Sequence, residues 1–338
     1  MISLKDIAER TGLSINTVSR ALRGSGYVSV CSRQLVESAA VEMGYQPNRA
    51  ARSLRCRKSF EVAAINFLHG REGRCDSLSM SKVIGMKHYL AGAGYELSLH
   101  FAYDGDHLTE AVSALLAEIV LQKPAGIILN GGSSLSLEIY RKLEELQMPC
   151  VMISYFKMDN VNCVYIDRQQ GVYDAVKFML ESGRQRVGFV GFTGCSNRIS
   201  GYRKAVAEFG QAEIIIEVES YHHSNIGDIF EIGRRNAVDI ARLPLRPDGI
   251  QAYSDYLAAG LIAGFHESGL RIPEDIAIIG FDDRELAMFT NPPLTTIEQP
   301  NEQTGKLAAD LLLQSISGSA KNYIAVKVPM ALKKRRSA

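Results

Sequence analysis

The stretch LKDIAERTGLSINTVSRAL, residues 4–22, carries the strongest structural signal in this chain of 338 residues. Ser3 stands just before it and three residues ahead of Asp6, the spacing of a capping box at the start of a helix. Gly12 can adopt the positive φ of a tight turn, and Ser14 is of a residue type that caps a second helix. Two short helices joined by a three-residue turn with glycine predict a helix-turn-helix.

Positive charge is concentrated in the same part of the chain. Residues 1–60 contain ten Lys and Arg against four Asp and Glu, a net charge of +6, whereas the whole chain carries +1. A basic segment attracts the phosphates of nucleic acid. The second helix of a helix-turn-helix enters the major groove of DNA. A solvated basic face would explain the charge but not its coincidence with this motif, so we predict a DNA-binding module.

The rest of the chain alternates between short apolar runs and amphipathic stretches of helical length. The apolar runs are residues 62–68, 95–102, 125–130, 150–154, 163–167, 186–191, 213–219, 248–254 and 275–282. Strands separated by helices predict parallel sheets that are covered on both faces. Because the series runs twice, with a break near residues 155–162, we expect two doubly wound α/β subdomains. The default ligand site lies between them, beyond the carboxyl ends of the strands.

Several other classes of protein find no support in the sequence. No run of 18 apolar residues predicts a membrane span, and MISLKDIAERTG is typical of a charged helix, not of a signal peptide. The six cysteines form no C-x-x-C pair and several lie in apolar runs, which predicts reduced thiols in a cytoplasmic protein. The seven histidines show no metal-ligand spacing, so we expect no metal site.

Motifs for catalysis are also missing. The glycines of GFVGFTG, residues 188–194, are spaced G-x-x-G-x-x-G, which differs from the dinucleotide fingerprint. The sequence contains no phosphate loop, no G-x-S-x-G elbow and no H-E-x-x-H. We therefore expect no cofactor and no enzymatic activity.

Four further stretches accompany the helix-turn-helix in the order GYVS (26–29), MGYQPNRAARSLR (43–55), GLRIPEDIAIIGFDD (269–283) and NPPLTTIEQP (291–300). With them the chain resembles the LacI/GalR family of bacterial transcription regulators over essentially its whole length. The resemblance implies a homodimer that binds near-palindromic operator DNA, a repressor more than an activator. It also implies a periplasmic-binding-protein-like core that grips a small effector, a sugar or sugar derivative.

The alternatives are a sugar-binding transport protein, which would need a signal peptide and no helix-turn-helix, and a nucleotide-dependent α/β enzyme, which would need a phosphate loop. The predicted fold is a small all-α helix-turn-helix domain followed by two doubly wound parallel-sheet subdomains. The predicted boundaries are residues 1–46 for the DNA-binding domain, 47–59 for a hinge, 60–160 with 294–323 for the first subdomain, 161–293 with 324–332 for the second, and 333–338 for a basic tail.

The second helix of the motif has a polar face and an apolar face. Asn16, Arg20 and Arg23 share one face at spacings of four and seven residues, and Asn and Arg pair well with adenine and guanine. Val18 and Leu22 are expected in the core. Spacing alone groups Ile15 with the core, whereas the resemblance assigns its position to base reading, here against a thymine methyl. Ser14, Thr17 and Ser19 complete the predicted DNA-binding set, the last two as phosphate ligands.

The hinge is predicted to be a short helix that Asn48 caps. Such a helix is too short to be stable alone, so we expect disorder without DNA. The resemblance implies that it folds as a pair on DNA, where Leu54 wedges into the minor groove. Ala51 would allow close approach, while Arg52 and Arg55 would hold phosphates.

For the effector the resemblance points to Arg198, in NRISGYRKA, and to Asp282, in IIGFDD, as ligands of polar oxygens or N–H groups. A structural salt bridge is the alternative for each of them. Weaker candidates are Ser254, Ser154, His222, Asp76 and Ser77, and a plain surface role explains His222 and the charged loop 69–81 as well. Arg71 or Arg74 of that loop would suit an acidic or phosphorylated sugar, but the identity of the effector cannot be read from the sequence.

Overall fold

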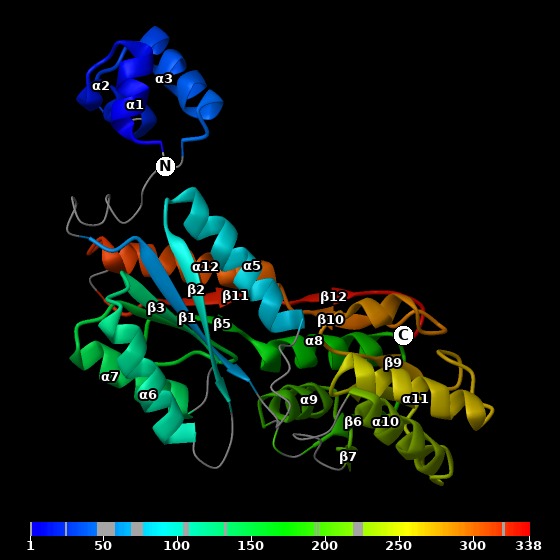
Figure 1. Cartoon of the computed structure of the whole chain (residues 1–338). Coiled ribbons are helices and arrows are strands. Elements are labelled where there is room, and N and C mark those ends of the chain that lie inside the picture. Colours follow the sequence, from blue (N-terminus) through cyan, green and yellow to red (C-terminus); the bar gives the residue numbers. More distant parts are fainter. Residues whose placement is uncertain are drawn as a thin grey trace. The chain divides into compact units, whose positions relative to one another are not determined.

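The computed structural model describes residues 2–23, 26–45, 58–68, 77–103, 108–131, 134–192, 194, 196–218, 226–319 and 322–338. The chain divides into two compact units, Met1–Ser59 and Phe60–Ala338 (Figure 1). Among the described residues no helix is both long enough and apolar enough to cross a bilayer.

The first unit contains three helices, α1 (Leu4–Thr11), α2 (Ile15–Arg23) and α3 (Val30–Glu42). The predicted capping box is present, because the Ser3 N–H donates to Asp6 Oδ2 at 2.7 Å and the Asp6 N–H donates to Ser3 Oγ at 3.4 Å. Gly12 ends α1 with a φ of 69°. Ser14 Oγ then accepts from the N–H of Thr17 at 3.1 Å and so begins α2. These contacts confirm the helix-turn-helix.

The three helices enclose a small core of their own. Ile7, Val18 and Val36, one from each helix, are fully buried, and the alanines of the three helices fill the space between them. Val18 is therefore a core residue, as predicted, and Leu22 packs against the same cluster while remaining half-buried.

The second unit begins with a six-stranded sheet in the order β11-β5-β4-β3-β1-β2. Its strands are β1 (Glu61–Leu68), β2 (Glu96–Tyr103), β3 (Gly126–Asn130), β4 (Cys150–Ser154), β5 (Cys163–Ile166) and β11 (Ala325–Val328). All neighbouring strands run parallel. The helices around it are α5 (Ser77–Gly92), α6 (Leu108–Leu121), α7 (Ser134–Glu145) and α12 (Asn301–Ile316).

Alternate residues of β1 point to opposite faces of this sheet. Val62 and Ala64 pack toward α5 and α12, whereas Ala63 and Ile65 pack toward α6 and α7. Both faces are therefore covered, as the apolar strands predict. Helices α5 and α12 approach so closely that a Cβ on Gly85 would overlap the backbone of Glu302.

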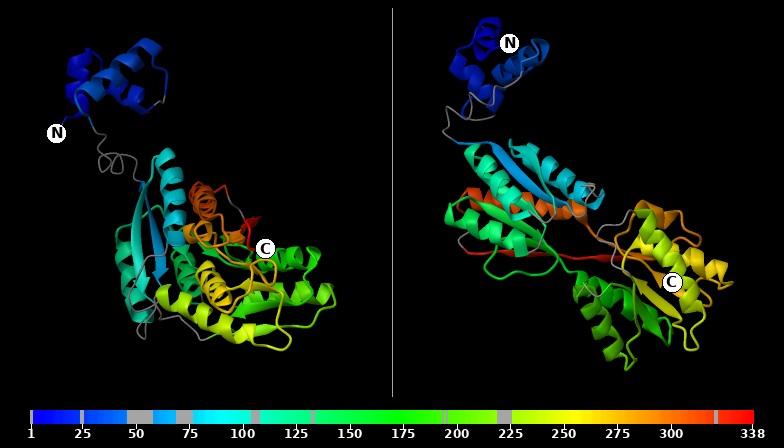
Figure 2. Two further views of the ribbon diagram at one scale, coloured as in Figure 1. Left: turned by 90° about the vertical axis from the view of Figure 1, so that its right-hand side faces the viewer. Right: turned by 60° about the horizontal axis from the view of Figure 1, so that its bottom comes forward.

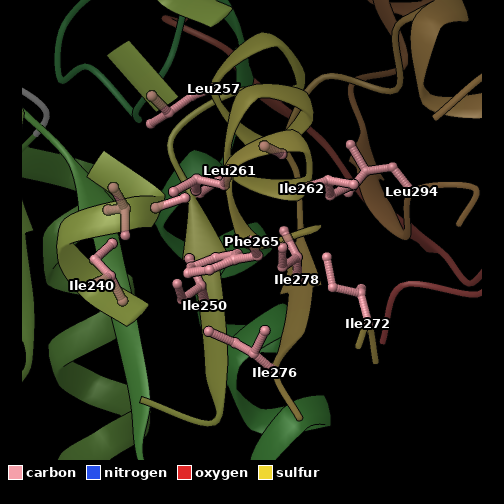
Figure 3. Packing of buried hydrophobic residues seen from close by; sticks show 14 of the residues in the cluster. Ile240, Ile250, Leu257, Leu261, Ile262, Phe265, Ile272, Ile276, Ile278 and Leu294 are labelled. Carbon is pink, nitrogen blue, oxygen red and sulfur yellow. The ribbon is translucent and has the colours of Figure 1, made fainter. Parts of the chain in front are cut away.

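The second sheet has four parallel strands in the order β7-β6-β8-β9. They are β6 (Val187–Gly191), β7 (Ile215–Glu217), β8 (Gly249–Ala252) and β9 (Ala277–Ile279). Helices α8 (Arg168–Glu181) and α9 (Ser196–Glu208) cover one face, and α10 (Ile226–Ala241) and α11 (Asp255–Glu267) cover the other. Figure 3 shows Ile250 and Ile278 of the sheet packed against Phe265 of α11. A short 3-10 helix, η1 (Glu285–Met288), follows β9.

Several connections join the two subdomains (Figure 2). The chain passes from the first sheet toward the second between β5 and α8. It returns between β10 (Thr296–Glu298) and α12, and passes again between β11 and β12 (Ala331–Lys333). Strands β10 and β12 pair antiparallel, and β10 also bridges to Asp282, just beyond β9.

The predicted boundary between the subdomains is wrong for three strands. Residues 294–323 are predicted in the first subdomain, but β10 pairs with β12, and Leu294 and Ile297 pack in the core of the second. Residues 161–293 and 324–332 were assigned to the second subdomain, but β5 and β11 pair with each other in the first sheet, from Cys163 beside Ala325 to Ile166 beside Val328. The polar segment 155–162 connects two strands of one sheet. A polar break marks an exposed turn, but it does not say which sheet the next strand joins.

Residues 333–338 do not form a separate basic tail. Ser337 is fully buried, and its hydroxyl donates to the carbonyl of Ile278 at 2.6 Å. Arg335 forms a salt bridge with Asp283 at 2.7 Å. The segment is part of the second subdomain because buried hydrogen bonds, which composition does not reveal, hold it beside β9.

Candidate functional site

The outward face of α2 carries side chains that the sequence predicts to read bases. Asn16 and Arg20 are exposed and one helical turn apart. Ile15 is 49 % exposed, which excludes the alternative that it belongs to the core. An amide, a guanidinium and an aliphatic group on one exposed face can together contact adenine, guanine and a thymine methyl in the major groove.

The small hydroxyl residues of α2 have other positions. Ser14 Oγ lies 2.9 Å from Thr17 Oγ1 and accepts from the backbone of Thr17, so both serve the start of the helix. Ser19 is only 5 % exposed, on the side of α2 that faces the core. Its burial argues against the phosphate contact that the sequence predicts for it.

Some predicted site residues fall outside the described part of the chain. They are the side chain of Arg23, the hinge residues Asn48, Ala51, Arg52, Leu54 and Arg55, and the effector candidates Asp76 and His222.

The structure brings Arg198 and Asp282 together. Arg198 lies in the first turn of α9, is 4 % exposed, and places Nη2 3.9 Å from Asp282 Oδ1. Its guanidinium stacks on the rings of Tyr253 and Phe281, each 4.0 Å from the guanidinium carbon, and donates to the carbonyl of Tyr253. The pair makes the salt bridge that the sequence left as the alternative, and it does so where β8 and β9 end.

Asp282 has a strained backbone and several partners. Its φ of 115° lies in the region that side chains rarely adopt, and such residues are concentrated at ligand sites. Its carboxylate accepts from the amide of Gln299 and lies 3.6 Å from Nε of Arg284. The N–H of Asp282 donates to the carbonyl of Ile297 at 2.8 Å, which fixes this conformation against β10.

Two predicted serines serve the chain itself. Ser254 Oγ accepts from the N–H of Leu257 at 3.3 Å and caps α11. Ser154, fully buried at the end of β4, donates to the carbonyl of Phe156 at 2.7 Å. Both hydroxyls are thus engaged in local structure, which argues against a direct ligand role.

Ser77 is the first residue of α5, and its hydroxyl accepts from Nη1 of Arg284 at 3.2 Å. This hydrogen bond joins the first subdomain to the segment after β9 in the second. Ser77 is thus linked through Arg284 to Asp282, and its role as an effector ligand stays a prediction.

Sequence reasoning missed most of the residues around this pair, and the most informative of them are Arg168, Lys82 and Tyr155. Arg168 begins α8 and stacks over the ring of Tyr155, with its guanidinium carbon 3.3 Å from the ring centroid. Burial lowers the pKa of Arg168. Lys82, in α5, is 2 % exposed and donates to Tyr155 Oη at 3.5 Å. The only signal in the sequence was a lysine within the apolar face of SKVIGM and an arginine directly after the strand CVYID.

Asp255 lies beneath the pair and is completely buried. Its carboxylate accepts from Thr296 Oγ1 at 2.5 Å and from the N–H of Arg284 at 2.6 Å. Burial, reinforced by the neighbouring charge of Asp282, raises the pKa of Asp255 to about 7. Asp255 thus anchors the segment after β9 through these hydrogen bonds, and its pKa lies close to neutral pH.

The chemistry of this cluster is that of a binding site. Guanidinium and ammonium groups supply hydrogen-bond donors, the carboxylate of Asp282 supplies an acceptor, and the aromatic rings supply flat apolar surface. Such convergent polar groups beside aromatic rings are typical of small-molecule sites. The described residues contain no cluster of His, Cys, Asp and Glu that could hold a metal ion.

Comparisons with known proteins agree with this architecture. Residues 3–48 match the model of the bacterial regulatory proteins of the lacI family, and residues 176–338 match that of a periplasmic binding protein-like domain. The chain is 31 % identical to the HTH-type transcriptional repressor CytR of Escherichia coli strain K12, over 94 % of this chain and 90 % of that protein. It is 30 % identical to the repressor PurR of Vibrio atlanticus, over 94 % and 92 %.

Among solved structures, the lac repressor dimer bound to operator and the anti-inducer ONPF has a TM-score of 0.76 with this chain. The match covers 99 % of this chain and 98 % of that one at 22 % identity, a likeness of fold. The predicted fold, a helix-turn-helix domain before two parallel-sheet subdomains, is therefore confirmed.

Proposed function

Since the chain belongs to the lacI family of bacterial regulatory proteins, we propose that it is a cytoplasmic repressor that binds operator DNA and responds to a small effector. The observation that carries the proposal is the outward face of α2, where Ile15, Asn16 and Arg20 stand exposed on a helix capped by Ser14. An aliphatic, an amide and a guanidinium side chain on one exposed face of the second helix of the motif match what base reading in the major groove requires.

On DNA we propose that α2 lies in the major groove, with Arg20 on a guanine and Asn16 on an adenine. The repressor acts as a homodimer on a near-palindromic site, so two copies of α2 read two half-sites. The lac repressor structure of similar fold is a dimer bound to operator, which supports this arrangement. In this proposal residues 47–59 are the hinge between the DNA-binding domain and the core, and Leu54 inserts into the minor groove.

The proposed effector site is the cluster around Arg198 and Asp282, between the two subdomains. A structure of similar fold, the regulator CelR, is described as a complex with cellobiose, which supports a sugar or sugar derivative as ligand. Ser77 and Arg284 join the two subdomains at this place by a hydrogen bond. A ligand that binds here changes operator affinity if it favours one arrangement of the subdomains over another, since only differential affinity shifts such an equilibrium.

The test begins with selection of bound duplexes from a random DNA library, followed by fluorescence anisotropy on the enriched sequence. We expect a near-palindromic site. Arg20→Ala should weaken binding to it by roughly 1 to 3 kcal/mol and relax the preference at one base pair in each half-site. The matched control is Arg10→Ala, which removes the same charge from an exposed position on α1.

Equal loss of affinity for all sequences in the Arg20→Ala variant would make Arg20 a phosphate contact. Failure of the library to yield any preferred sequence would contradict the proposed function itself.

A further inference from the structure

Cationic side chains gather at the proposed effector site. Lys82 and Arg198 are 2 % and 4 % exposed, and the side chain of Arg284 is 14 % exposed. Arg168 stands beside them at the start of α8. These four come from both subdomains, and burial of like charges is costly unless anions compensate them.

The four cations belong to one connected set of groups. Lys82 and Arg168 share the ring of Tyr155, with Lys82 Nζ 5.2 Å and the Arg168 guanidinium carbon 3.3 Å from its centroid. Arg168 Nη2 donates to Gln299 Oε1 at 3.4 Å, and the amide of Gln299 donates to Asp282. The carboxylate of Asp282 then meets the two remaining arginines. The hydrogen-bond donors of the four cationic groups therefore outnumber the acceptors that Tyr155, Gln299 and Asp282 supply.

The charges in this set do not balance. Against four cations stand two carboxylates, Asp282 and Asp255, and the pKa of Asp255 is raised to about 7, so it is partly protonated at neutral pH. Asp283 pairs with Arg335 at 2.7 Å instead. Among the described residues, this set therefore carries an excess of two to three positive charges in a largely buried place.

The excess is concentrated at Lys82 and Arg168. Asp282 lies against Arg198 and Arg284, whereas the contacts of Lys82 and Arg168 described above are with the phenol of Tyr155 and the amide of Gln299. Within the described residues, Nε of Arg168 is buried and makes no hydrogen bond. A buried guanidinium N–H without an acceptor is a donor that a ligand can satisfy.

We propose that the effector carries an anionic group, a carboxylate or a phosphate ester, and that Lys82 and Arg168 bind it. The inference rests on the proposed function and narrows its ligand from sugars in general to acidic ones. A planar guanidinium beside an ammonium suits either kind of anion. Arg198 and Asp282, whose charges balance one another at 3.9 Å, remain for the hydroxyl groups of the ligand.

The first experiment uses inorganic phosphate as the probe and the full chain. Thermal unfolding is followed in phosphate and in sodium chloride of equal ionic strength, for the wild type, Lys82→Met and Arg168→Gln. The control is Lys87→Met, an exposed lysine on the same helix. We expect phosphate to raise the melting temperature of the wild type above the chloride value, because a ligand of the native state stabilises it. This gain should disappear in Lys82→Met and Arg168→Gln and persist in Lys87→Met.

In chloride alone Lys82→Met should melt at a higher temperature than the wild type, because an uncompensated buried charge is removed. No gain from phosphate in the wild type, or an equal gain in Lys82→Met, would overturn the proposal. These outcomes do not depend on operator binding, so they can fail while the proposed function stands.

A second set of probes separates the sources of the anion. Glucose, glucuronate and glucose 6-phosphate are compared by calorimetry, as are ribose and ribose 5-phosphate. The inference expects one acidic member to bind at least tenfold more tightly than its neutral parent, and Lys82→Met to abolish that difference. A neutral sugar that binds wild type and Lys82→Met alike, and more tightly than its acidic relatives, would contradict the anionic effector but support the repressor.

Discussion

Replacement of Asp255 by Asn should make the protein more stable at neutral pH, by an advantage that shrinks as the pH falls from about 7 toward 3.8. The amide can accept from the N–H of Arg284 with its oxygen and donate its NH₂ to Thr296 Oγ1 once that hydroxyl turns from donor to acceptor, as it must for the protonated acid. The variant is therefore a mimic of the neutral carboxyl group that cannot ionise. Wild type and variant differ in this one titration.

The size of the effect follows from the pKa. In the unfolded chain an aspartate ionises at its usual value of 3.8, whereas Asp255 in the folded protein ionises at about 7. Between these values the folded state holds one proton more than the unfolded state. The free energy of unfolding therefore falls by about 1.4 kcal/mol for each unit of rising pH, and it stops falling above about pH 7. From pH 5 to pH 7 the wild type loses roughly 2 kcal/mol by this route, because the slope is already halved at the folded pKa.

Urea unfolding of both proteins at several pH values from 5 to 8 measures this loss. Subtraction of one free energy of unfolding from the other removes every titration that the two proteins share. We expect the advantage of Asp255→Asn to grow by roughly 2 to 3 kcal/mol across this range. A difference that stays constant from pH 5 to pH 8 would show that the pKa of Asp255 lies below this range, whether its ionisation is normal or its charge is stabilised, and would refute the argument from burial.

Other predictions follow from the packing and from the site. Gly85→Ala should destabilise the second unit by roughly 1 to 3 kcal/mol, because the new Cβ forces α5 away from α12. Gly92→Ala on the same helix, with open space around it, should be neutral or stabilising by up to about 1 kcal/mol. Equal melting temperatures of the two variants would contradict this prediction. Arg198→Met should weaken effector binding by roughly 1 to 3 kcal/mol and leave operator affinity without effector near wild type, with Arg203→Met, an exposed residue of the same helix, as control. Titration of operator complexes with effector measures both quantities, and an Arg198→Met protein that still responds at wild-type concentrations would remove Arg198 from the site.

The sequence allowed much of the fold to be predicted because its signals are local. The capping box at Ser3 and the positive φ of Gly12 depend on residues a few positions apart, and both are present as predicted. Every predicted apolar run contains a strand. The fully buried strands among them, such as β3, β4 and β6, need a continuous apolar stretch. What failed was the partnership of β5 with β11, which joins residues about 160 positions apart and has no local signature.

The site was less predictable for a similar reason. The resemblance led to Arg198 and Asp282, and the structure places them in contact. The resemblance cannot reveal that the hydroxyls of Ser254 and Ser154 form local hydrogen bonds, since such a serine looks like any other serine in the sequence. Lys82 was overlooked because a lysine on a helix is ordinarily exposed, and its partner Tyr155 comes from a distant part of the sequence.

The segment around Ser337 also bears on how this protein avoids association. Strand β9 is the last strand in the order of the second sheet, so its outer edge would offer free N–H and C=O groups to any extended chain. Here the N–H of Ile278 donates to Ser337 at 2.7 Å, and the N–H of Gly280 donates to Thr295 at 2.8 Å. Two short pieces of the same chain thus occupy the edge in alternation. Substitutions that remove these contacts would expose the unpaired edge of β9, and the protein would aggregate during expression. The ligand site and α2 would remain intact in the molecules that stay soluble.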